Sequence, residues 1–78
     1  MLFRSDLDGA LANFMRATEL DPEYANAHLN KALALKFLGR AGAAADAFQR
    51  YLDLRPDAGN AGQVRAQIEQ LRASATND

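Results

Sequence analysis

The sequence predicts an all-α protein in which four helices form antiparallel helix-turn-helix repeats. The first observation is composition: 49% of the 78 residues are hydrophobic, yet Val and Ile occur once each, while the helix-favouring Ala, Leu, Arg and Gln are frequent. The second is the placement of helix-breaking residues, because Pro22, Gly39 and Pro56 separate the apolar stretches. The third is a repeat, since Leu-Asp-Pro at 20–22 returns as Leu-Arg-Pro at 54–56, an offset of 34 residues (56 − 22 = 34).

The first helix is expected from about Asp6 to Leu20, and its apolar positions are Leu7, Leu11, Phe14 and Leu20. Pro22 disfavours helix at Asp21 and suits a new helix start, so the second helix is expected from about Glu23 to Leu38. Gly39 then ends this helix as a left-handed cap.

The third helix is expected from about Ala41 to Leu54, and Pro56 prevents it from continuing. The fourth is expected from about Gly59 to Ala73, with its apolar stripe at Val64, Ile68 and Leu71. Polar residues occupy its other faces, as they do in a capping helix. A chain of this length forms one domain, which is predicted to span residues 1–73 and to be followed by a disordered tail at 74–78.

Sliding the chain by 34 residues aligns Phe3 with Phe37, Ala10 with Ala44, and Phe14 with Phe48. The period of 34, the pattern Ala-x3-Phe and the Pro eight residues after each Phe resemble the tetratricopeptide repeat (TPR) family. The resemblance implies units of two antiparallel helices, A then B, that stack and curve around a groove. It makes the chain about one and a half repeats plus a C-terminal capping helix. Such a chain is either a natural unit or the C-terminal piece of something longer.

Several positions depart from the family pattern. His28 and Gly62 stand where a large aromatic is common early in helix A, and Lys31 stands where Leu is common. His28 has no Cys or carboxylate partner at ligand spacing, so it is predicted to fill the core rather than bind a metal. Asp6 and Asp8 lie at a helix start, where carboxylates cap free N–H groups, and no acid–base role is predicted for them.

Composition argues against several classes of function. The net charge is −1 and Lys and Arg are scattered singly, so nucleic acid is not an expected partner. No apolar run approaches the roughly 18 residues of a membrane span. The chain has no Cys, which removes disulfides, thiolate catalysis and Cys-bound metal and agrees with a cytoplasmic location. No catalytic residue, cofactor or metal site is predicted.

The resemblance assigns a partner-binding groove to one face of the A helices. On the second helix this face holds Asn26, Leu29, Asn30, Leu33, Lys36 and Phe37, and on the fourth it holds Asn60, Gln63, Gln67 and Gln70. Leu29, Leu33 and Phe37 form an apolar ridge at four-residue spacing. This ridge either completes the core or docks an extended peptide or helix, with Asn30 and Asn60 bonding the backbone of the ligand.

The leading hypothesis is a non-catalytic protein-interaction module that binds a peptide or helix of a partner protein. The alternatives are a repeat segment of a larger enzyme and a self-assembling structural unit. Because the chain starts with helix B, Leu7 and Leu11 are expected to lack cover from a preceding helix A. A homodimer or higher oligomer formed through Leu7 and Leu11 is therefore predicted.

Overall fold

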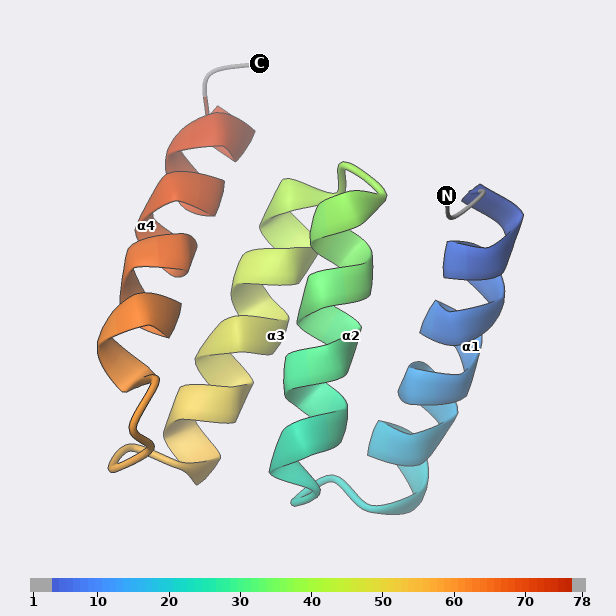
Figure 1. The fold of residues 1–78 in the computed structure, drawn as a ribbon, viewed down its shortest axis with the longest axis horizontal. Coiled ribbons are helices and arrows are strands. Elements are labelled where there is room, and N and C mark those ends of the chain that lie inside the picture. The colour runs from blue at the N-terminus through green and yellow to red at the C-terminus, as the bar shows by residue number, and fades with distance from the viewer. Residues whose placement is uncertain (1–3, 77–78) are drawn as a thin grey trace.

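The computed structural model describes residues 4–76 and contains four α helices. They are α1 (Arg4–Leu20), α2 (Ala25–Phe37), α3 (Ala41–Leu54) and α4 (Ala61–Thr76). The helices lie side by side, each antiparallel to the one before it, with α3 between α4 and α2 and with α1 at the outer edge (Figure 1). Packing follows chain order, since α1 packs on α2, α2 on α3, and α3 on α4. The predicted all-α fold of antiparallel helices is confirmed.

The turn between α1 and α2 is held by Asp21. The Asp21 carboxylate accepts a hydrogen bond from the backbone N–H of Glu23 (3.2 Å), and the Asp21 carbonyl accepts one from the N–H of Tyr24 (3.0 Å). These bonds keep Pro22 and Glu23 in the turn, so α2 begins at Ala25, two residues after the expected start at about Glu23. A side chain that bonds the backbone two residues on is a common competitor of helix.

The turn between α2 and α3 depends on Gly39, whose φ is +80°. The N–H of Gly39 donates to the carbonyl of Lys36 (3.1 Å), and the N–H of Arg40 donates to the carbonyl of Leu35 (2.9 Å). This pair of bonds is the Schellman motif, which satisfies the last free carbonyls of a helix and needs a left-handed residue. The prediction of Gly39 as a left-handed cap is confirmed.

Two successive turns connect α3 and α4. The N–H of Ala58 donates to the carbonyl of Arg55 (3.2 Å), and the N–H of Ala61 donates to the carbonyl of Ala58 (3.0 Å). Helix α4 therefore begins two residues after the predicted start at Gly59. At its other end, residues 74–76 continue α4 rather than beginning the predicted tail, and residues 77 and 78 lie outside the described part of the chain.

The core is built from small side chains around a few large ones. Phe48 of α3 is 2% exposed and contacts a cluster that includes Leu35 of α2 and Ile68 of α4. Phe14, its counterpart one repeat earlier, is only half-buried and packs against the edge of that cluster. The predicted apolar stripe of α4 is confirmed, because Val64, Ile68 and Leu71 are all buried.

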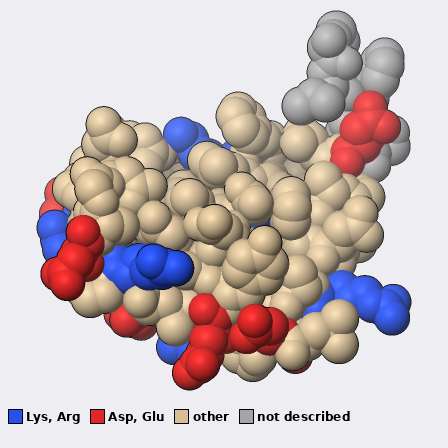
Figure 2. Space-filling model, turned by 60° about the horizontal axis from the view of Figure 1, so that its bottom comes forward, with Lys and Arg blue, Asp and Glu red and all other residues tan. Residues whose placement is uncertain are grey.

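The surface mixes charges of both signs. On the face seen in Figure 2, Lys, Arg, Asp and Glu lie mainly along the margins, and uncharged side chains cover most of the area between them. The basic side chains on this face do not form a continuous stripe. Within residues 4–76, none of the helices has the length and apolar character needed to cross a bilayer.

Candidate functional site

A groove of about 370 Å³ runs between α2 and α4, with α3 at its base. It is lined by Leu29, Leu33 and Lys36 of α2, Phe48 of α3, Asn60 just before α4, and Gln63, Val64 and Gln67 of α4. The repeat explains this geometry, because α2 and α4 each pack on α3 and so stand on either side of it. The groove is therefore a consequence of stacking one A-type helix beside the next.

The base and one wall of the groove are apolar. Phe48 and Val64 are buried in the core beneath it, and Leu29 is half-buried against the same core. Leu33 differs from these three residues, because 38% of its surface is exposed. Its side chain is therefore available to a ligand without a change in the core.

Three amide side chains form the opposite wall of the groove: Asn60, Gln63 and Gln67. Asn60 is held in place because its Oδ1 accepts a hydrogen bond from the Tyr51 hydroxyl (2.9 Å), which leaves its NH₂ group free of that bond. The Oε1 atom of Gln67 is buried and has no hydrogen-bond partner among residues 4–76. A buried amide oxygen without a partner costs free energy. Turning this amide toward a ligand in the groove breaks no bond within the described chain.

Of the described residues that line the groove, Lys36 is the one with a charged side chain. It is exposed and forms no ion pair or hydrogen bond through its side chain within the described residues. An ammonium group at the edge of an apolar groove attracts an acidic group on a ligand. The groove can thus take apolar side chains on its base, backbone or amide groups along α4, and an anionic group near Lys36.

The structure brings together five of the eight residues assigned to the groove from the sequence: Leu29, Leu33, Lys36, Asn60 and Gln63. The other three, Asn26, Asn30 and Phe37, are exposed on an adjacent stripe of α2 and do not line it. Phe37 is 69% exposed, so the ridge that it was expected to form with Leu29 and Leu33 turns away from the groove at its end. Of the two further glutamines of α4, Gln67 lines the groove and Gln70 does not.

Two lining residues, Phe48 and Val64, were not among the residues assigned to the groove from the sequence. Each lies in the core and also forms part of the groove base. The 34-residue repeat predicts the helix to which each residue belongs. It does not predict which part of a buried side chain reaches the surface. No sequence signal separates these two positions from the rest of the core.

His28 is buried, as expected from its place in the repeat. The ring is 8% exposed, and Nε2 donates to the carbonyl of Pro22 (2.8 Å). This bond ties the first turn of α2 to the α1–α2 turn. In the part of the chain that the structure describes, no three His, Cys, Asp or Glu side chains cluster in a way that could hold a metal ion.

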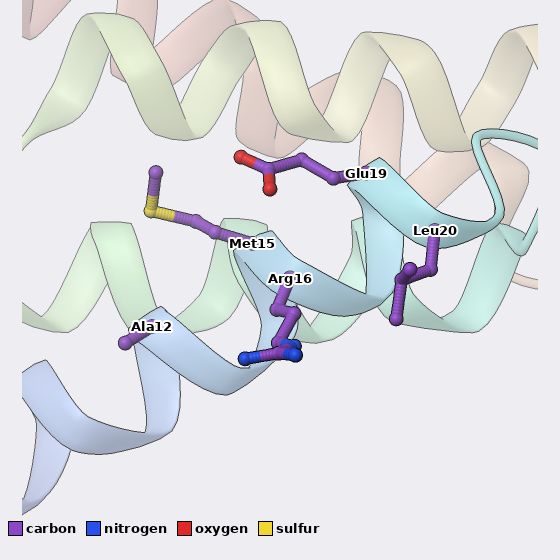
Figure 3. A pocket seen from close by; sticks show the side chains of 5 residues that line it. All are labelled: Ala12, Met15, Arg16, Glu19 and Leu20. Atoms are coloured by element: carbon purple, nitrogen blue, oxygen red, sulfur yellow. The ribbon is translucent and has the colours of Figure 1, made fainter.

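The exposed face of α1 is not the one expected. Leu11 is 4% exposed and lies in the core, and Leu7 is half-buried against that core. The expectation that these leucines lack cover is wrong, because α1 turns them toward α2. The face that α1 leaves open instead surrounds a shallow hollow of about 460 Å³, lined by Ala12, Met15, Arg16, Glu19 and Leu20 (Figure 3).

A second groove, of about 480 Å³, lies between α1 and α3 over a different face of α2. Its charged residues are Lys31, Arg40, Asp46 and Arg50. It contains none of the residues that the sequence assigned to partner binding. Its charges are mixed in sign, and His28 beneath it is already bonded to Pro22.

A sequence model of the tetratricopeptide repeat matches residues 1–69 of the chain. An uncharacterized protein of Methanocaldococcus jannaschii is 47% identical over 49 residues, which make up 63% of this chain and 57% of that protein. The matched part therefore spans little more than half of this relative. No solved structure gives a significant match.

Proposed function

The chain belongs to the tetratricopeptide repeat family, and from that premise we propose that it binds a peptide or helix of a partner protein in the groove between α2 and α4. Repeats of this family are in general protein-interaction modules. The proposal adds the place and the residues: Leu33 and Leu29 for apolar contact, Gln63 and Gln67 for hydrogen bonds, and Lys36 for an acidic group. It assigns no chemical step to the chain.

The observation that carries the proposal is the unpaired amide of Gln67 beside an exposed leucine. A peptide docks through alternating apolar side chains and backbone groups that need hydrogen-bond partners. Leu33 supplies accessible apolar surface, and Gln67 supplies an amide whose oxygen has no partner in the described part of the chain. Both requirements of a peptide are met within one groove.

The proposal predicts which substitutions abolish binding. Peptides selected from a displayed library of random short sequences on the immobilised parent chain should lose binding to Leu33→Asp, because a carboxylate on the groove wall cannot be desolvated against an apolar side chain. Leu33 is partly exposed, so this variant should keep the helical circular dichroism spectrum of the parent. Leu29→Ala is a poorer test because Leu29 also packs on the core.

The matched control is Arg65→Ala, since Arg65 is exposed on α4 and does not line the groove. Removing a single exposed charge changes a free energy by about 0–1 kcal/mol, so selected peptides should bind this variant almost as they bind the parent. A selection that yields no binding peptides would contradict the proposal. So would peptides that bind Leu33→Asp and the parent equally.

A further inference from the structure

The open face of α1 carries two large apolar side chains. Met15 is 42% exposed and Leu20 is 77% exposed, and both border the hollow shown in Figure 3. Among residues 4–76, the remaining large exposed hydrophobic residues are Tyr24, Leu33 and Phe37, none of which lies on α1. Exposed apolar residues gathered on one face mark an interaction surface more often than scattered ones do.

The two charged residues on this face have opposite charges, and neither is paired within the described residues. Arg16 and Glu19 are exposed, and neither forms an ion pair or side-chain hydrogen bond within the described residues. In Figure 3 the two side chains extend in different directions and do not meet. In Figure 3, Met15 and Glu19 point to the side on which α3 is seen, whereas Arg16 and Leu20 point to the other side. Each side of the face thus has one apolar and one charged residue, and the charges are opposite.

We propose that a second copy of this chain covers the face, with the two α1 helices parallel and related by a twofold axis that runs along them. Such an axis brings the Met15–Glu19 side of one copy against the Arg16–Leu20 side of the other. Glu19 and the Arg16 of the second copy are then three residues apart along the axis, about 4.5 Å at the rise of an α helix. Long side chains span this offset readily.

The face is self-complementary, which is the reason for choosing a second copy as its occupant. The twofold axis makes every contact twice, so the dimer has two Arg16–Glu19 pairs and an apolar strip of two Met15 and two Leu20 side chains. In Figure 1, α2, α3 and α4 all lie on one side of α1. One helix face is a small interface, below the roughly 1,200 Å² of a standard complex, so the dimer is weak.

The test is sedimentation equilibrium of the purified chain from micromolar to millimolar concentration. The parent should approach twice the 8.5 kDa mass of one chain as concentration rises. Glu19→Arg and Arg16→Glu should each weaken the dimer by about tenfold or more, because each places like charges against each other. The double variant Arg16→Glu/Glu19→Arg should restore the affinity of the parent, since the pairs are rebuilt with their charges exchanged.

Two controls keep the result interpretable. Glu69→Arg changes the net charge as Glu19→Arg does but lies exposed on α4, and it should dimerise like the parent. Met15→Glu should dissociate the dimer while the helical circular dichroism spectrum is kept, because Met15 is outside the core. A parent that stays monomeric at every concentration overturns the proposal. A dimer that ignores the single reversals, or that the double exchange does not restore, overturns it equally.

The proposal does not depend on the function of the groove between α2 and α4. Peptide binding that is lost in Leu33→Asp and kept in Glu19→Arg would support the groove whether or not the chain dimerises. Dimerisation that is lost in Glu19→Arg and kept in Leu33→Asp would support the α1 face whether or not a peptide binds.

Discussion

Helices α1 and α3 occupy the same place in the 34-residue repeat but differ in how they are covered. α3 packs on α2 and on α4, whereas α1 packs mainly on α2. Phe48 of α3 is therefore buried, while its counterpart Phe14 is half-buried. Likewise Leu54 packs against the core at the end of α3, while its counterpart Leu20 is exposed on α1. Position in the repeat decides which side chains turn inward, and the number of neighbouring helices decides how far they are buried.

α1 and α3 also differ in the type of residue on their outer faces. One repeat after Met15 stands Gln49, which is half-buried and donates a hydrogen bond to Asp53 (3.1 Å). α3 thus pairs a polar side chain along its own surface, whereas α1 exposes Met15 beside Arg16 and Glu19, which form no ion pair within residues 4–76. This contrast supports α1, rather than α3, as the helix that meets a second copy.

The largest expected effect is the difference between the two phenylalanines. Phe48→Ala should lower the free energy of unfolding by about 3–5 kcal/mol, as in other buried aromatic sites. Phe14→Ala should cost about 1–3 kcal/mol, because part of that ring is already in water. Urea denaturation followed by circular dichroism measures both values. Equal losses would mean that α1 and α3 are covered to the same extent.

A smaller effect is expected at the ends of the same two helices. Leu54→Ala should cost about 1–2 kcal/mol, since a half-buried leucine loses part of its contacts. Leu20→Ala should change the free energy of unfolding of the monomer by less than about 0.5 kcal/mol, because surface substitutions usually do. The measurement is made at low concentration, where a weak dimer is dissociated. A Leu20→Ala loss as large as that of Leu54→Ala would place Leu20 in the core.

The smallest expected effect is an increase in the stability of the folded chain. Gly9 lies within α1 where its repeat counterpart on α3 is Ala43 (9 + 34 = 43), and a Cβ built on Gly9 would meet nothing within 4 Å. Gly9→Ala should therefore stabilise the chain by roughly 0.5–1 kcal/mol, the usual difference between these residues inside a helix. The thermal midpoint should rise accordingly. A lower midpoint would show that α1 needs glycine at this position.

The sequence was sufficient to predict the number, order and direction of the helices. Pro22, Gly39 and Pro56 mark the turns, and the 34-residue period relates the two halves. The starts of α2 and α4 were less predictable because they depend on local hydrogen bonds, namely the bond from the Glu23 N–H to the Asp21 carboxylate and the two successive turns after α3. Helix propensity alone does not show that such turn bonds are more favourable than one more turn of helix.

The helices that form the groove were predictable from the sequence, but the individual residues that line it were not. Leu29, Leu33 and Lys36 line the groove in the structure, while Phe37 does not, because a four-residue step turns slowly around a helix and leaves the groove after two turns. The misplacement of Leu11 has another cause. Cover was assigned to a preceding helix, whereas α2 supplies it.

The central claim is that the groove between α2 and α4 binds the partner, and a titration followed by two-dimensional NMR tests it most directly. A peptide selected on the parent chain is added to the ¹⁵N-labelled protein at low protein concentration. The largest shift changes should fall on the backbone amides of Leu33, Lys36, Gln63 and Gln67. Shift changes confined to Met15, Arg16 and Glu19 of α1, with the groove amides unmoved, would contradict the account.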